Sequence, residues 1–175
     1  MALLTALSRS TSSGHVTTRI EQGAAFMADV HGRLTGRVAV ALATLGPGAT
    51  NLRTGIADAY LDRAPMVAIT GQASSDKLYK EAHQVVDIVR MFEPVTKWNT
   101  RVERVEAVPE IVRKAFRVAT LEKPGPTDIE LHEDLAAMAS GSGSVIRPPV
   151  PGHPPAPHPT AQPLPPPATL PRTRG

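Results

Sequence analysis

Cysteine is absent from the 175-residue sequence, which excludes disulfides, thiolate catalysis and a cysteine-based zinc site. Aromatic residues make up only 3% of the chain, so a core has to be built from Ala, Val, Ile and Leu. Small aliphatic side chains suit helices that pack closely on a sheet. No apolar run approaches the ~20 residues that cross a bilayer. We therefore expect a cytoplasmic protein without a membrane partner.

The net charge of +3 comes from the last residues of the chain, and the remainder has no net charge. Residues 1–140 contain 16 Lys and Arg and 16 Asp and Glu, and the excess comes from Arg147, Arg172 and Arg174. No cluster of basic residues is interleaved with aromatic ones, so the sequence predicts no nucleic-acid partner. The first 19 residues contain two Arg, many Ser and Thr and no acid, a composition that is also typical of an organelle transit peptide. That alternative stays open.

The composition divides the chain near residue 140. Twelve of the 18 prolines lie between Pro148 and Pro171, and proline fixes φ and lacks an amide donor. We expect residues 140–175 to be a disordered, extended tail or linker, with a PxxP ligand as the alternative. Residues 1–139 have the composition of one globular domain.

Apolar periodicity in residues 1–139 predicts alternating helices and short strands. Expected helices are Ala2–Arg9, Gln22–Leu34, Ala49–Leu61, Gln84–Met91 and Val108–Leu121. Expected strands are His15–Arg19, Val38–Thr44, Met66–Thr70 and Thr127–Leu131, with Pro94–Lys97 as a further candidate. Short apolar strands joined by helical crossovers predict an α/β fold, a doubly wound and mostly parallel sheet with helices on both faces.

Ligands of such sheets lie at the carboxyl ends of the strands. Glu21 follows one expected strand, and the small residues after it leave room for a flat ligand; a plain helix-start charge is the alternative. The Gly46–Gly48 turn (Gly-Pro-Gly) follows another strand and matches neither a Walker loop nor a dinucleotide fingerprint. A tight turn capped by Thr50 or Asn51 is its alternative interpretation. The element order also allows a nucleotide-binding flavodoxin-like domain, but no phosphate fingerprint is present.

Several motifs occur in an order that matches one family. The run RIEQGAAFMADVHGRLTG…ATLGPGATNLRTGIADAYLDRAPMVAITGQ, followed by HQVVDIVRMFEPVTKWN and PEIVRKAFRVATLEKPGPTDIELHED, resembles the aminopyrimidine-binding (PYR) domain of thiamine-diphosphate enzymes. The similarity is strongest to acetolactate synthase large subunits and covers roughly Leu3 to Asp134. It implies the PYR-type sheet, with the family's first strand missing.

The resemblance implies a cofactor, thiamine diphosphate, and a role for Glu21. In the family this carboxyl hydrogen-bonds N1′ of the aminopyrimidine and favours the imino tautomer that removes the thiazolium C2 proton. Gly46, Pro47, Gly48 and Asn51 are implied to form the wall beside the pyrimidine, and Gln84 to face the reacting centre. An ordinary polar residue at a helix start is the alternative for Gln84.

The resemblance also implies partners. Family enzymes hold magnesium and diphosphate in a separate diphosphate-binding (PP) domain with a GDG motif, and acetolactate synthases hold FAD in a central domain; this sequence contains neither. We expect no metal ligands here. We expect a homodimer, or pairing with a PP-domain chain, through the helix face Gly23–Leu34, and a 2-keto acid as substrate. The alternative function is a non-catalytic gene fragment or interaction module that keeps the fold.

Overall fold

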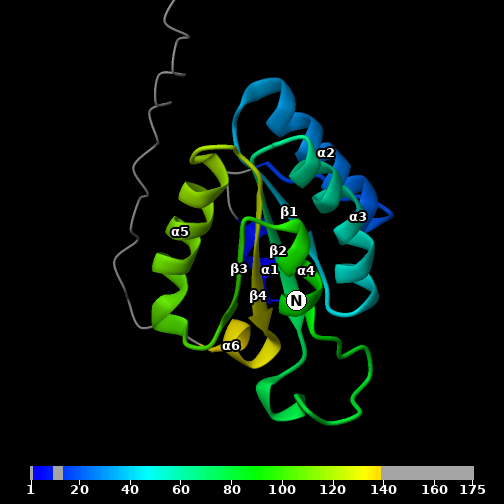
Figure 1. Cartoon of the computed structure of the whole chain (residues 1–175). Helices are drawn as coiled ribbons and strands as arrows, with labels where there is room; N and C mark the ends of the chain where they lie inside the picture. Colours follow the sequence, from blue (N-terminus) through cyan, green and yellow to red (C-terminus); the bar gives the residue numbers. More distant parts are fainter. Residues whose placement is uncertain (1, 10–13, 139–175) are drawn as a thin grey trace, which may run out of the picture.

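The computed structural model describes residues 2–9 and 14–138, and these form one parallel α/β sheet with helices on both faces (Figure 1). The helices are α1 (Ala2–Ser8), α2 (Glu21–Thr35), α3 (Pro47–Leu61), α4 (Ile88–Phe92), α5 (Val108–Thr120) and α6 (Glu133–Ala137). The strands are β1 (Ala39–Ala43), β2 (Met66–Gln72), β3 (Trp98–Val102) and β4 (Pro126–His132). Short 3-10 turns lie at Ser75–Lys77, Glu93–Val95 and Val105–Ala107. The expected tail, residues 140–175, lies outside the described residues.

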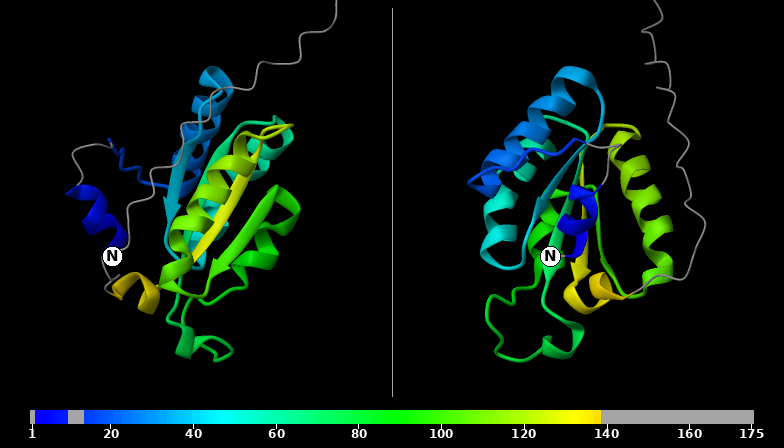
Figure 2. Two further views of the ribbon diagram at one scale, coloured as in Figure 1. Left: turned by 90° about the vertical axis from the view of Figure 1, so that its left-hand side faces the viewer. Right: turned by 180° about the vertical axis from the view of Figure 1, so that it is seen from behind.

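The sheet has the strand order β1-β2-β4-β3, and every neighbouring pair is parallel. Alternate residues of β2 point to opposite faces. Met66 and Ala68 join the core beneath α2, α3 and α4, while Val67 joins a second core with residues of α5. Figure 2 shows α5 on one side of the sheet and α4 on the other. The predicted fold class is confirmed.

Two expected strands are wrong. Residues 14–18 have no regular structure, and Val16 is 71% exposed although the segment is rich in β-branched residues. A segment with high strand propensity forms a strand only when it packs against a neighbouring strand. Residues 14–18 have no such neighbour, because β1, at the edge of the sheet, pairs only with β2 among the described residues. The other error is Pro94–Lys97, because Pro94 lies in a 3-10 turn and β3 begins only at Trp98. Lys97 N nevertheless donates to Pro126 O at 2.8 Å, which starts the pairing of β3 with β4.

The expected helix Gln84–Met91 is present only in its second half, as α4. Gln84 has a φ of +63°, a left-handed conformation that no α-helix contains. The helix begins after Asp87, whose Oδ1 accepts a hydrogen bond from Arg90 N at 3.2 Å. Asp87 thus acts as an N-cap, which the sequence-based boundary overlooked.

Helices α2 and α3 lie side by side on one face of the sheet (Figure 1). A Cβ on Gly55 of α3 would lie 2.6 Å from the Cβ of Ala25 in α2, so only glycine permits this approach. Arg33 of α2 forms ion pairs with buried Asp29 of its own helix and with Asp58 of α3. Small residues and this ion-pair cluster fix the relative position of the two helices. Among the described residues, no helix is both long and apolar enough to cross a membrane.

Candidate functional site

The first element of the site is a contact between the start of α2 and the second turn of α3. Glu21 is the first residue of α2, where a carboxylate is stabilised by the helix dipole. Asn51 Nδ2 donates to Glu21 Oε2 at 3.2 Å. Gln22 Nε2 donates to Thr54 Oγ1 at 3.3 Å, one helical turn further along α3. These two bonds fix the orientation of Glu21 relative to α3.

The second element is the Gly-Pro-Gly turn that links β1 to α3. Gly46 has a φ of +54° and precedes the helix, and Pro47 occupies its first position, where a missing amide hydrogen costs nothing. Gly48 lies directly beside Glu21: a Cβ there would be 3.5 Å from Glu21 Oε1 and 2.7 Å from Cγ2 of Thr44. The absence of a side chain at Gly48 keeps space in front of the carboxylate.

The alternative interpretation of this turn, a cap by Thr50 or Asn51, is wrong, because neither side chain accepts a hydrogen bond from the start of α3. Thr50 Oγ1 donates to Pro47 O at 3.0 Å, whereas the Asn51 amide is directed to Glu21. α3 also begins two residues earlier than the expected Ala49–Leu61. The turn relies on the positive φ of Gly46 rather than on a side-chain cap, which leaves the Asn51 amide to orient the Glu21 carboxylate.

Gln84 reaches the same turn from a distant part of the chain. A Cβ on Gly46 would lie 2.5 Å from Gln84 O and 2.8 Å from Gln84 Cβ. Gln84 is itself exposed and left-handed, so its segment passes directly over the turn. The structure thus brings Glu21, Gly46, Gly48, Asn51 and Gln84 together, with Pro47 between the two glycines.

A row of buried polar residues on β4 was not singled out from the sequence. Asp128, Glu130 and His132 point to the same face of the sheet and are at most 3% exposed. Thr70 Oγ1 donates to Asp128 Oδ1 at 3.2 Å, and Arg101 Nε donates to Glu130 Oε1 at 2.5 Å. Alternating polar residues in TDIELHED, within a strand expected to be buried, were the available signal.

Burial raises the pKa of Asp128 to about 8, more than the Thr70 hydrogen bond lowers it. The neighbouring Glu130 charge raises this pKa further. One oxygen of Glu130, Oε2, is buried and has no hydrogen-bond partner among the residues that the structure describes. Within residues 2–9 and 14–138, no group of three or more His, Asp or Glu side chains is arranged to hold a metal ion.

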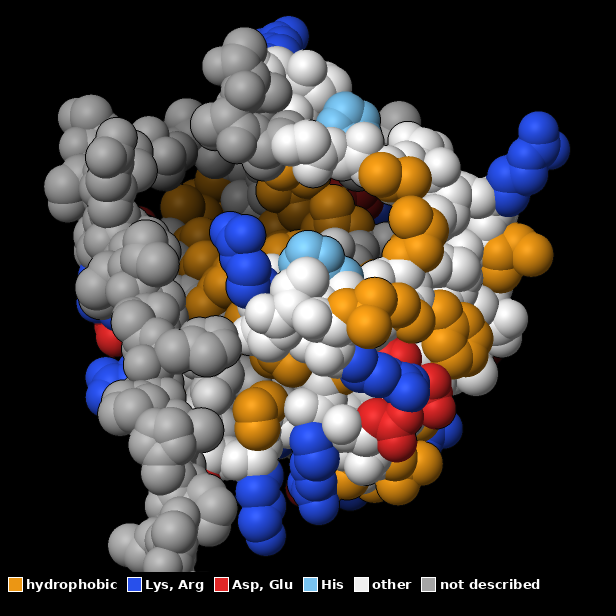
Figure 3. Space-filling view, turned by 90° about the horizontal axis from the view of Figure 1, so that it is seen from above, with side chains coloured by type: hydrophobic (Ala, Val, Ile, Leu, Met, Phe, Trp, Pro, Cys, Tyr) orange, Lys and Arg blue, Asp and Glu red, His pale blue; other side chains and the backbone are white. Residues whose placement is uncertain are grey.

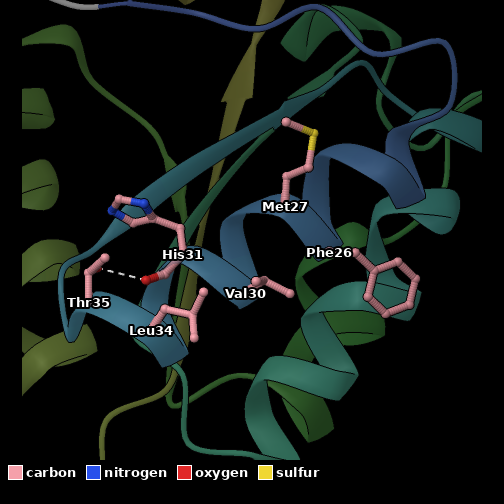
Figure 4. A pocket seen from close by; sticks show the side chains of 6 residues that line it. All are labelled: Phe26, Met27, Val30, His31, Leu34 and Thr35. Carbon is pink, nitrogen blue, oxygen red and sulfur yellow. Dashed lines mark hydrogen bonds between the residues drawn. The ribbon is translucent and has the colours of Figure 1, made fainter.

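A separate groove runs along the outer surface of α2. Its lining, shown in Figure 4, consists of Phe26, Met27, Val30, His31, Leu34 and Thr35. Four of these are large apolar side chains with exposures of 38% to 81%. The groove includes neither Glu21 nor Asn51, so it is a surface feature distinct from the carboxylate site. It lies within the helix face expected to contact a partner.

Comparison with known proteins places these features in a family. Residues 1–91 match the family model described as thiamine pyrophosphate enzyme, N-terminal TPP binding domain. The chain is 45% identical over 121 residues to the probable acetolactate synthase large subunit of Methanocaldococcus jannaschii, covering 69% of this chain and 20% of that protein. It is 44% identical over 130 residues to the acetolactate synthase isozyme 1 large subunit of Escherichia coli, covering 74% and 23%. The chloroplastic acetolactate synthase of Arabidopsis thaliana is 42% identical over 135 residues, covering 77% and 20%. The match spans about a fifth of the length of these relatives.

Proposed function

Because the chain belongs to the thiamine pyrophosphate enzyme family, through its N-terminal cofactor-binding domain, we propose that it forms the aminopyrimidine-binding half of an acetolactate synthase-like active site. The single observation that supports this most directly is the placement of Glu21. Asn51 holds one carboxylate oxygen at 3.2 Å, and the other faces Gly48, where no side chain blocks a ligand. The pair joins two segments that are 30 residues apart in the sequence.

Glu21 is the proposed catalytic residue, and its task is to share a proton with N1′ of the aminopyrimidine. A carboxyl group suits this task because it forms a short, charge-assisted hydrogen bond to a ring nitrogen. When bound, thiamine diphosphate supplies the carbon–carbon bond chemistry on a 2-keto acid. Asn51 orients the carboxyl, and Gly46, Pro47 and Gly48 provide a wall without bulky side chains. Gln84, on the segment over this wall, faces the substrate.

The remaining parts of the site come from elsewhere in this proposal. As the family resemblance implies, a PP domain is proposed to hold magnesium and the diphosphate. The α2 face Gly23–Leu34, with its exposed Met27 and Leu34, is the proposed contact to a second copy of this chain or to a PP-domain chain. The alternative, a non-catalytic interaction module, uses the same face without the cofactor.

Titration with thiamine diphosphate tests the proposal, with and without a separately expressed PP-domain chain of a relative. We expect tight binding and 2-keto acid turnover only in the mixture. Glu21→Gln should abolish turnover, because an amide cannot share a proton with N1′. Glu106→Gln, at an exposed glutamate in another part of the fold, is the matched control and should retain activity. Full activity of Glu21→Gln would refute the role of this carboxyl, and a mixture without cofactor binding would favour the non-catalytic alternative.

A further inference from the structure

The segment that carries Gln84 has little structure of its own to hold it in place. Residues 78–87 contain neither helix nor strand. Gln84 adopts a left-handed φ of +63°, and such a conformation persists in a non-glycine residue only when its surroundings impose it. Gly46 supplies one constraint, since its missing side chain admits the Gln84 backbone. A second constraint must hold the segment from the side of the sheet.

Gln72, the last residue of β2, makes that second contact. Its Nε2 donates to Val86 O at 2.9 Å, two residues beyond Gln84. Its Oε1 accepts a hydrogen bond from Ala73 N at 3.0 Å, and the side chain is only 2% exposed. Ala73 O lies 2.7 Å from Nδ1 of buried His132 on β4. The amide is therefore fixed at the sheet while it holds the segment.

We propose that Gln72 is a positioning residue for Gln84. Its side-chain amide connects the carboxyl end of β2 to Val86 and so presses the segment against Gly46. This inference rests on the proposed function, because it gives the hydrogen bond from Gln72 to Val86 a purpose at the Glu21 site. The amide serves both bonds, since Val86 O requires a donor and Ala73 N an acceptor, whereas a carboxylate of the same length only accepts.

Amide hydrogen exchange of the full chain tests, without any cofactor, whether the Gln72–Val86 hydrogen bond holds the segment. Gln72→Met keeps the length of the side chain and removes both polar contacts. Loss of a hydrogen bond of ordinary strength should accelerate exchange within residues 84–87 by about threefold to tenfold. The acceleration is read at the Val85 amide, which donates to Ala82 O at 3.3 Å. Exchange in β2 and β4 should stay slow. Ser75→Ala, which removes the hydroxyl contact to Asp134 in the same connection, is the control and should leave 84–87 unchanged.

Gln72→Glu adds a readout that general loosening of the fold would not produce. A protonated carboxyl donates to Val86 O and accepts from Ala73 N, whereas the carboxylate only accepts. Burial raises the pKa of a carboxyl at this position. Exchange at 84–87, relative to wild type at the same pH, should therefore be near normal at pH 5 and several-fold faster at pH 8.

Other ionisable side chains lie near Gln72 and Val86, so the pH dependence needs a control. His132, Glu130 and Asp128 lie on β4, Arg101 on β3 and Asp87 in the segment itself. They are unchanged in Gln72→Met, which should show the same acceleration at both pH values. The proposal is overturned if 84–87 exchange at wild-type rates in both variants, or if β2 and β4 accelerate equally.

Turnover measured in the presence of a PP-domain chain tests whether the Gln72–Val86 hydrogen bond acts through Gln84. Gln72→Met and Gln84→Ala should each lower kcat more than they change KM. The double variant should be no slower than Gln84→Ala alone, because both changes act through one side chain. Losses that multiply would overturn the proposal. If Glu21→Gln keeps full turnover, the proposed function fails while the exchange result still decides whether Gln72 holds the segment.

Discussion

At the scale of the residue, Asp128 is the side chain whose environment is least suited to its charge. It is fully buried, its hydrogen-bond donor is the Thr70 hydroxyl, and Glu130 lies two residues further along the same face. Burial raises the pKa of Asp128 from 3.8 to about 8. The folded chain therefore keeps this proton at pH values where the unfolded chain has lost it.

The consequence is a stability that falls with rising pH. Between about pH 4 and pH 8 the unfolded state is ionised at this site and the folded state is protonated. The contribution of Asp128 to the unfolding free energy is full below pH 4 and is lost through this window, by at most about 1.4 kcal/mol per pH unit. Asp128→Asn should flatten the dependence and stabilise the chain at pH 8. Urea unfolding from pH 5 to pH 8.5 measures it; an unchanged slope in the variant would show that other groups cause the dependence.

The residues of the site differ in how visible they are in the sequence. Asn51 was predictable as a site residue because it follows a strand-to-helix junction, where topology gathers side chains. The strand expected before Glu21 is not formed, so the prediction of Glu21 rests on the family resemblance. Their direct hydrogen bond follows from the crossing of α2 and α3, which sequence periodicity does not specify. The role of Gln72 was not predictable, because its partner Val86 lies in a segment without periodicity.

At the scale of the element, the approach of α2 to α3 decides whether Glu21 and Asn51 meet. The two helices touch where Gly55 faces Ala25, and a Cβ at Gly55 would also lie 2.9 Å from the backbone N of Phe26. Backbone atoms cannot move aside as a flexible side chain can. A methyl group at Gly55 must separate the helices, and with them the two ends of the 3.2 Å hydrogen bond.

Gly55→Ala should therefore destabilise the chain despite the better helix propensity of alanine. Overpacking costs about 1–3 kcal/mol, whereas replacing a helical glycine by alanine contributes only about 0.5–1 kcal/mol. Gly23→Ala is the matched control, because a Cβ there comes no closer than 4.0 Å to its nearest neighbour, Thr18. Chemical denaturation should show a loss for Gly55→Ala and a small gain for Gly23→Ala. Equal effects at both glycines would contradict the close-approach account.

Three of the four strands in the described chain were predictable from the sequence, and one was not. The expected bounds of β1, β2 and β4 differ from the observed ones by at most two residues. The run that became β2 is apolar because helices cover both faces of the sheet there. Residues 14–18 include three β-branched residues but pair with no strand among the described residues. β3 escaped prediction because WNTRV is half polar and only Val102 of it is fully buried.

At the scale of the whole molecule, hydrophobic side chains remain exposed at the surface. Seen from above, some of them line a hollow (Figure 3). The α2 groove adds Met27 at 52%, Val30 at 48% and Leu34 at 81% exposure, all on one helix face. Apolar patches of this kind typically mark contact surfaces between proteins. The family resemblance implies a partner contact through this face.

Self-association through α2 is the prediction that follows at this scale. Burying a leucine of this exposure contributes about 1.5–3 kcal/mol, so Leu34→Lys should weaken association about tenfold or more. Lysine is compatible with the last turn of a helix, where the dipole favours a positive charge. Leu61→Lys, at the end of α3 and 75% exposed, adds the same charge outside the groove and is the matched control. Sedimentation velocity across a concentration series should show a shift to monomer for Leu34→Lys alone; equal shifts for both variants would attribute association to charge rather than to the α2 face.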